Sequence, residues 1–337
     1  MISIIFHKQL SAILIQKLES FCHSFTSIGL HQALAFSKAM EPKRQQSFCV
    51  AQNEEYEIFG FCIIHYSFPL VSIQDGPISK NDAIICLMID SIRKRYNKRF
   101  FAFTTIQLPY ACTALAENSK NKTVIENYFN YQNWSTSIIE LFDLHNLSKN
   151  LSKGHLSAIK KAEKWGITVS NDFSNQTILT FSVLFDETYK TRKIKAQWNN
   201  TESYFIELSK QMNLTKSFFI GAYLENKLVA GGIFLTQGDT VHYKYGSSNH
   251  QMRSIPLMHS VLFNAMVYAQ KQGFRFFDLG GINLSAPEGS QVYAINTFKK
   301  GFGGNIISSP KRIYFANNRV SLAIVLLLLK LKKYIHK

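Results

Sequence analysis

The fold class of this chain is decided by residues 218–246, FFIGAYLENKLVAGGIFLTQGDTVHYKYG. Residues 218–224 and 228–235 are short apolar runs, and the polar residues Glu225, Asn226 and Lys227 between them favour a tight turn. Residues 240–246 form a third run of the same kind. We therefore expect three consecutive antiparallel strands here.

Helical and extended segments surround these strands. Helical spacing covers residues 173–193 and 203–212 upstream and residues 260–272 downstream, and residues 274–279 are a further strand. This order is the layout of a GNAT fold, although the pattern alone leaves other α+β sheets open.

The first half of the chain is also α/β in character. Residues 59–65 and 100–103 look extended, and residues 81–95 have helical spacing. The polar segment 144–154 separates the halves, and 337 residues exceed what one compact core usually needs. We predict an α/β (α+β) protein of two tandem GNAT-like domains with mixed sheets flanked by helices: an N-terminal domain at 1–150, a catalytic domain at 151–315 and an apolar, basic C-terminal helix at 316–337.

The chain is strongly basic, because 38 Lys and Arg against 22 Asp and Glu give a formal net charge of +16. Such a surplus suggests a polyanionic partner, which could be nucleic acid, anionic lipid or a diphosphate-linked substrate. The alternative is that AT-rich coding simply favours lysine. Charge alone therefore does not choose a function.

Cysteine usage and the first residues indicate a cytoplasmic protein. The sequence contains no Cys-x-x-Cys pair for zinc or redox chemistry, and residues 1–21 lack the basic start of a signal peptide. We expect buried, reduced thiols at all five cysteines, which are Cys22, Cys49, Cys62, Cys86 and Cys112.

Residues 320–329 form the strongest apolar run of the sequence. The run is far shorter than the ~20 residues that cross a bilayer. Lysines follow it at Lys330, Lys332, Lys333 and Lys337. The segment is either a packed terminal helix or an interfacial helix that contacts an anionic membrane at its inner face.

Five short segments carry the functional argument. Three of them are specific in their order and spacing: YKYGSSN at 243–249, FFDLGG at 276–281 and TFKKGFGG at 297–304. The others are DGPI at 75–78 and IKKAEKWGI at 159–167. Together they resemble the FemABX family, whose members add amino acids from aminoacyl-tRNA to peptidoglycan precursors. The resemblance implies an aminoacyltransferase of cell-wall biosynthesis, with aminoacyl-tRNA as donor and a peptidoglycan precursor as acceptor.

The chemistry of this transfer points to Lys299. An amine that attacks an activated carbonyl needs positive charge or N–H donors near the developing oxyanion, and it needs no protein nucleophile. The sequence contains neither GxSxG nor HExxH, and we expect no cofactor and no metal. The resemblance implies that Lys299 stabilises the charged intermediate beside the aminoacyl end. Phe298 could stack on the terminal adenine of the acceptor stem, and we assign Lys300 to substrate binding. Alternatively, Lys299 and Lys300 are surface lysines before a glycine-rich turn.

Further substrate contacts are expected on the third strand. Tyr243 and Tyr245 share one face by the period-two geometry of a strand, although aromatic residues in strands usually belong to the core. Gly246, Ser247 and Ser248 follow directly and leave space where a GNAT sheet splays. The resemblance implies that a tyrosine near this place contacts the precursor, so we assign both tyrosines and both serines to substrate binding.

Two charged residues complete the predicted site. Asp278 ends an apolar strand, so it could orient a substrate amine or cap the following Gly-Gly turn. The resemblance implies that Arg192 reaches the phosphates of the precursor, which suit a guanidinium. The sequence departs from the family pattern at 193–197. Lys38 and Lys43 are candidates for the family's basic contact in the first domain.

The basic helix at 157–165 also has two interpretations. Its lysines, Lys160, Lys161 and Lys164, could face phosphates at the domain junction or could form an ordinary solvated face. Gly166 directly after it is expected to supply a left-handed C-cap.

A different class of acyltransferase remains the main alternative. Acyl-CoA N-acyltransferases hold the pyrophosphate on backbone N–H groups of a Q/R-x-x-G-x-G/A loop. The equivalent stretch here, RSIPLM at 253–258, has Pro256 and Met258 in the glycine positions, which disfavours that mode. Acyl-CoA-dependent enzymes of polysaccharide or lipid pathways and a catalytically silent binding protein stay open. We expect a monomer.

Overall fold

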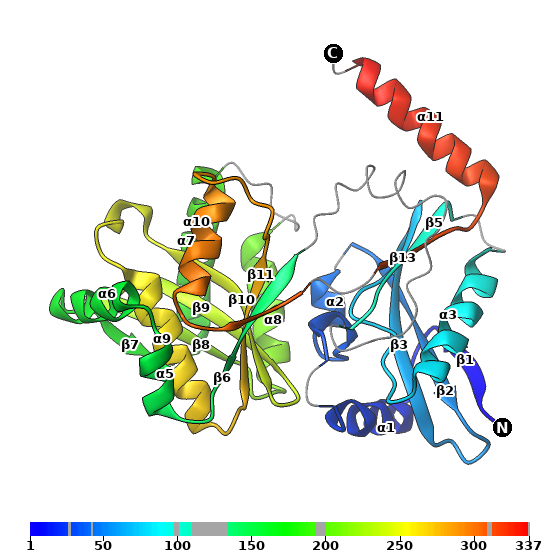
Figure 1. The fold of residues 1–337 in the computed structure, drawn as a ribbon, viewed down its shortest axis with the longest axis horizontal. Coiled ribbons are helices and arrows are strands. Elements are labelled where there is room, and N and C mark those ends of the chain that lie inside the picture. Colours follow the sequence, from blue (N-terminus) through cyan, green and yellow to red (C-terminus); the bar gives the residue numbers. More distant parts are fainter. Residues whose placement is uncertain are drawn as a thin grey trace. The chain divides into compact units, whose positions relative to one another are not determined.

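The computed structural model describes residues 1–25, 28–41, 43–97, 101–109, 134–192, 200–308 and 312–335. The chain forms two compact units, shown with their elements in Figure 1. The first unit combines Met1–Gln132 with Pro310–Lys337, and the second unit is Asn133–Ser309.

The first unit is built on a six-stranded sheet with the order β1-β2-β3-β4-β5-β13. Only β4 and β5 pair in parallel; the other neighbouring strands are antiparallel. Its elements are β1 (Ser3–His7), α1 (Ala12–His23), the 3-10 turn η1 (Leu30–Gln32), α2 (Ser37–Met40), β2 (Gln45–Gln52), β3 (Ile58–Ser67), β4 (Leu70–Ile73), α3 (Asp82–Asn97), β5 (Phe103–Gln107), β13 (Arg312–Ala316) and α11 (Arg319–Ile335).

The second unit is built on a seven-stranded sheet with the order β12-β6-β11-β10-β9-β8-β7, in which only β10 and β11 are parallel. Its elements are β6 (Ser135–Glu140), α5 (Leu144–Asn150), α6 (Lys153–Lys164), β7 (Thr168–Ser170), α7 (Asn175–Thr191), α8 (Thr201–Met212), β8 (Phe218–Leu224), β9 (Lys227–Gln237), β10 (Thr240–Ser248), the 3-10 turn η2 (His250–Met252), α9 (Leu257–Lys271), β11 (Phe276–Ile282), α10 (Gln291–Lys300) and β12 (Asn305–Ile307).

Helices cover both faces of the second sheet because its central strands are apolar on both sides. In β8, Phe218 and Ile220 join the core under α6 and α9. Phe219 between them points the other way and packs against Phe181 of α7, with ring centroids 5.3 Å apart. The predicted class, two mixed sheets flanked by helices, is confirmed.

Local predictions in the second half are also confirmed. The turn between β8 and β9 places Glu225 and Asn226 at positive φ, as a tight hairpin requires. Gly166 has φ +78 and ends α6 in the left-handed conformation. The polar segment 144–154, in contrast, is not a linker: it forms α5 and the first residues of α6.

The division into units differs from the boundaries predicted at residues 150 and 315. β6 pairs with β11 and β12, so residues 134–150 lie in the second unit. β13 pairs with β5, so the chain returns to the first unit before α11. Both differences come from strand pairings between residues far apart in the sequence, which local composition does not reveal.

The described cysteines lie inside the first unit. Cys22, Cys49 and Cys62 are buried and Cys86 is partly buried, while Cys112 lies outside the described residues. Burial raises the pKa of the Cys22 and Cys49 thiols to about 12, so both stay protonated and unreactive at neutral pH. Among the described helices, none combines the length and apolar character that crossing a bilayer requires.

Candidate active site

The site lies where two parallel strands of the second sheet part. β10 and β11 pair only from Thr240 with Phe276 to His242 with Asp278. Beyond this point β10 continues along β9 alone, and the register of β11 on β6 shifts between Asp278 and Gly281. The two strands therefore leave a gap at their carboxyl ends, where ligands of α/β sheets usually bind.

Lys299 of α10 reaches into this gap. Its ammonium Nζ donates a hydrogen bond to the carbonyl of Gly281, at 2.8 Å. A Cβ at Gly280 would lie 3.6 Å from Nζ, which is ordinary contact distance. Burial lowers the pKa of Lys299 to about 8, and the nearby charge of Asp278 opposes this shift. The ammonium is therefore mostly protonated at neutral pH, yet poorly solvated.

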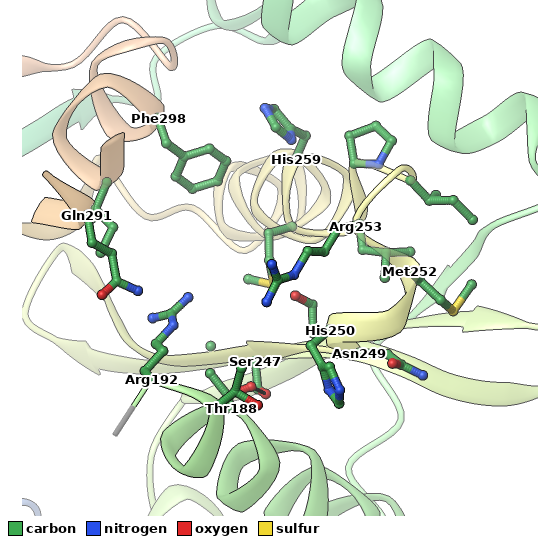
Figure 2. Close-up of a pocket in the computed structure, with 18 of the residues that line it drawn as sticks. Thr188, Arg192, Ser247, Asn249, His250, Met252, Arg253, His259, Gln291 and Phe298 are labelled. Atoms are coloured by element: carbon green, nitrogen blue, oxygen red, sulfur yellow. Dashed lines mark hydrogen bonds between the residues drawn. The ribbon is translucent and has the colours of Figure 1, made fainter. Parts of the chain in front are cut away.

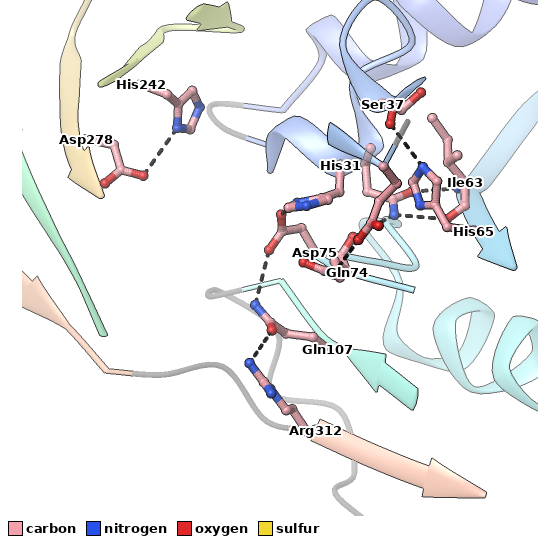
Figure 3. Close-up of polar contacts among 12 residues, drawn as sticks. His31, Ser37, Ile63, His65, Gln74, Asp75, Gln107, His242, Asp278 and Arg312 are labelled. Carbon is pink, nitrogen blue, oxygen red and sulfur yellow. Dashed lines mark hydrogen bonds and ion pairs between the residues drawn. The ribbon is translucent and has the colours of Figure 1, made fainter. Parts of the chain in front are cut away.

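Asp278 is held behind Lys299 by three hydrogen bonds. The His242 ring donates from Nδ1 at 3.2 Å (Figure 3), the backbone N–H of Gly280 donates at 2.8 Å, and the Thr136 hydroxyl also donates. Burial would raise the pKa of Asp278, but these bonds outweigh it and hold the pKa below its ordinary value. The Asp278 carboxylate therefore caps the turn at Gly280 and lies near the Lys299 ammonium.

A cavity of about 670 Å³ opens beside Lys299 and Phe298. Figure 2 shows Arg192, at the end of α7, and Arg253, after η2, pointing into it from different walls. Among the described residues, those that line it include these two arginines and Lys299 but no Asp or Glu. An anionic ligand would therefore meet positive charge and no acidic side chain.

Six of the nine predicted site residues line this cavity: Arg192, Tyr243, Ser247, Ser248, Phe298 and Lys299. Asp278 lies behind Lys299, as described above. Lys300 is exposed on α10 and Tyr245 points elsewhere, so neither is among the lining residues. The Ser247 hydroxyl donates to the carbonyl of Leu184 at 2.8 Å, which ties β10 to α7.

The expectation that Tyr243 and Tyr245 share one face is wrong. β10 carries a register shift between them, so the bulge at Lys244 reverses the alternation. Tyr243 packs on the α9 side, where its ring stacks on Phe234 at 5.7 Å. Tyr245 joins the aromatic cluster of α7 and α8, and its hydroxyl lies 2.7 Å from that of Tyr204.

Gly246 is required by the position of Tyr243. A Cβ at Gly246 would lie 1.8 Å from the Tyr243 hydroxyl oxygen. Only glycine leaves room for this hydroxyl at the cavity wall, which explains why glycine follows the two tyrosines.

The C-terminal turn of α10 is clamped by the start of α6. The His155 ring donates from Nε2 to the carbonyl of Phe298 at 2.8 Å, one of the last carbonyls of the helix, and accepts from the Ser152 hydroxyl at Nδ1. A Cβ at Gly301 would lie 2.0 Å from His155 Cε1. Gly303 has φ +83. The glycines of KKGFGG therefore allow α6 to pack closely against the end of α10, next to Phe298 and Lys299.

Sequence reasoning missed three residues of this site. His259 lines the cavity, and burial lowers its pKa to about 4, so it is neutral at physiological pH. His155 contacts the His259 ring, with centroids 4.6 Å apart. Neither histidine lies in a recognisable motif. Arg253 could have been found, because it opens the loop that we compared with the acyl-CoA pattern.

The remaining predicted basic residues lie outside this cavity. Lys160, Lys161 and Lys164 are exposed on α6. The Lys38 ammonium donates to the carbonyl of Arg44 at 2.7 Å, and Lys43 is exposed. The exposed positions on α6 favour an ordinary solvated face for its lysines.

The DGPI segment organises the first unit. Asp75, at φ +59, accepts from His31 at 3.1 Å and from Gln107 at 3.4 Å. Gln107 in turn accepts from Arg312 at 2.8 Å (Figure 3). The chain of contacts joins η1, the end of β4, β5 and β13, so this motif fixes the strand ends of the first sheet.

The two α/β units, each with one parallel strand pair, have a tandem GNAT-like fold, and solved structures with low sequence identity agree. The crystal structure of FemX aligns with a TM-score of 0.71 at 14% identity, covering 92% of this chain and 96% of that one. A tandem GNAT protein from the clavulanic acid biosynthesis pathway aligns with a TM-score of 0.56 at 8% identity, covering 94% and 99%.

The sequence comparisons match part of the chain. The FemAB family model matches residues 192–324, which confirms the FemABX resemblance over this stretch of the chain. Lipid II:glycine glycyltransferase of Staphylococcus saprophyticus is 30% identical over 79 residues, and that of Staphylococcus aureus 28%. Each alignment covers 23% of this chain and only 19% of the relative.

Proposed function

We propose that this protein is an acyltransferase that moves an aminoacyl group from aminoacyl-tRNA to an amine of a peptidoglycan precursor. The observation that carries the proposal is the Lys299 ammonium, which lies where β10 and β11 part and beside a cavity lined by cations. The family match and the names of the glycyltransferase relatives support the choice of reaction.

In this mechanism the acceptor amine attacks the ester carbonyl of the donor. The C–N bond forms, the C–O bond to the ribose breaks, and the amine gives up a proton while the ribose oxygen gains one. Lys299 stabilises the negative charge that develops on the carbonyl oxygen, a type of contribution typically worth ~100-fold or more in rate. The carbonyl of Gly281 orients the ammonium, the charge of Asp278 favours its protonated form, and the His155 hydrogen bond holds the end of α10.

The arginines would bind the phosphate groups that either substrate carries. Arg192 and Arg253 have the planar, multidentate donors that suit phosphate oxygens. The cavity walls add Phe298, whose ring can stack on a base. The sequence-based predictions of a monomer at the cytoplasmic face of the membrane, working without a cofactor, complete the proposal.

An acyl-CoA N-acyltransferase is the second candidate, because the tandem GNAT fold is shared. Against it, Pro256 forms the N-cap of α9 and Met258 lines the cavity, where standard enzymes expose glycine N–H groups.

A matrix of donors and acceptors separates the two candidates. The purified protein is incubated with charged tRNA or acyl-CoA, each with lipid-linked or soluble precursor. We expect consumption of charged tRNA only when a precursor is present. If the protein consumes acyl-CoA but not charged tRNA, the second candidate replaces the proposal.

A further inference from the structure

The C-terminal helix α11 has one face that packs and one that does not. Ser321 and Val325 are buried, and Val325 lies in a small core with Leu70, Phe103 and Tyr314 of the first unit. The opposite face follows the spacing i, i+3, i+4, i+7, i+8 and consists of exposed Val320, Ala323, Ile324, Leu327 and Leu328.

This exposed stripe is apolar throughout, which is unusual for a surface helix. Val320 is 64% exposed, Leu327 58% and Leu328 57%. A helix that only packs against its own unit would place polar residues here. A continuous apolar stripe on the surface marks a site of interaction.

The charge around the stripe indicates the kind of partner. Within the first unit, residues 310–337 contain seven lysines and arginines and no acidic residue. Lys330, Lys332 and Lys333 follow the stripe within the same helix. An apolar stripe with an excess of cations and no acid matches a surface that is anionic outside and apolar beneath, which is a bilayer containing anionic lipid.

We propose that α11 is an interfacial helix that holds the protein on anionic membranes. The 17 residues of α11 are too few to span a bilayer, so the helix lies in the headgroup region with the stripe toward the acyl chains. Figure 1 shows α11 following β13 at the end of the first unit. The inference rests on this surface alone and does not depend on the reaction proposed above.

Vesicle flotation of the full chain tests the proposal. Vesicles of mixed phosphatidylglycerol and phosphatidylcholine are compared with pure phosphatidylcholine at low and high salt. We expect binding to the mixed vesicles that weakens with salt, and much weaker binding to the neutral ones. The double variant Leu327→Ser/Leu328→Ser should bind roughly tenfold less or weaker still. Replacing Lys330, Lys332 and Lys333 by Gln should remove the preference for anionic lipid.

The matched control is Ile13→Ser/Leu214→Ser, which changes two residues that are 72% and 78% exposed elsewhere. It should bind vesicles like the parent. Equal binding by the parent and the α11 variants would overturn the proposal. The proposal would also be overturned if light scattering shows that the parent is a dimer and the double serine variant a monomer, while neither binds vesicles. A second copy of the chain would then cover the stripe. Unfolding of the double serine variant would show that the stripe packs internally and would equally overturn it.

Discussion

Lys299 is a cation that the fold holds partly out of water, next to the carboxylate that faces it. Its ammonium bonds to the carbonyl of Gly281, and Asp278 behind it is kept ionised by its own hydrogen bonds. Such an arrangement costs stability and prepares a charge for use in a transition state. Because burial lowers the pKa of Lys299, the free energy of unfolding should depend on pH in a way that a Lys299 variant reveals.

We expect Lys299→Met to be at least as stable as the parent at pH 7, with an advantage that shrinks toward pH 10. The pKa of Lys299 is about 8 in the folded chain, against 10.5 for an unperturbed lysine. Between these values the unfolded state binds more protons, so the parent's free energy of unfolding rises with pH, and the variant lacks this contribution. Denaturant titrations at both pH values measure the difference.

The control is Lys300→Met, the exposed neighbour on the same helix. Its stability relative to the parent should not change between the two pH values. A Lys299→Met difference that also stays constant with pH would show that the buried ammonium is not what sets the stability here.

At the residue scale, the sequence predicted Lys299 and Phe298 from the short motif at 297–304, and Arg192 from the family resemblance. It misplaced Tyr245, since a bulge depends on how β10 pairs with β9 and leaves no local signal. His155 was missed because its partners lie about 145 residues away, at Phe298 and Gly301.

At the scale of the elements, α10 is bounded by two glycines. Its glycines Gly289 and Gly301 stand just before and just after it but have opposite roles. Gly289 has φ +78, and no atom lies within 4 Å of the position that a Cβ would take there. Gly301 has ordinary φ, and the His155 ring lies within 2.0 Å of its Cβ position. Substitutions at these two glycines therefore distinguish the effect of backbone strain, at Gly289, from the effect of a steric clash, at Gly301.

We predict that Gly301→Ala destabilises the protein by about 1–3 kcal/mol, the range for overpacking a tight contact. It should also lower transfer, because the displaced turn carries Phe298 and Lys299. Gly289→Ala should cost about 1–2 kcal/mol through strain alone and leave the Lys299 site intact. Thermal unfolding and transfer rates check both variants; equal loss of transfer in the two would argue against the clamp.

The periodic elements themselves were predictable. The β8–β9 hairpin, α9 and the C-cap at Gly166 follow from apolar spacing and turn residues. α5 was not predicted, because its polar sequence resembles a linker and its helical form depends on burying Leu147 and Leu151 beside the second sheet.

At the scale of the whole molecule, the division into units could not be obtained from composition. β6 and β13 are each decided by pairing partners far away in the chain, β11 and β5 respectively. The net charge of +16, in contrast, is a property of the entire sequence and gives a prediction of its own.

Binding of tRNA should weaken steeply as salt rises, because each phosphate contact releases counterions. In a filter-binding titration, Arg253→Gln should reduce the slope of log affinity against log salt by about one if this arginine contacts a phosphate of the donor. Lys271→Gln, an exposed lysine at the end of α9, serves as the control with an unchanged slope. If the affinity of the parent for tRNA does not change with salt, aminoacyl-tRNA is not the donor of the proposed reaction.

The most direct test of the proposed reaction is the rate of aminoacyl transfer from charged tRNA to lipid-linked precursor by the parent, Lys299→Met and Lys271→Met. We predict that Lys299→Met stays folded and loses roughly two orders of magnitude in rate, the usual effect of removing one oxyanion-stabilising group, while Lys271→Met keeps the parent's rate. A folded Lys299→Met variant that transfers within about twofold of the parent would contradict the proposed role of Lys299, since so small a loss leaves no oxyanion contact to assign.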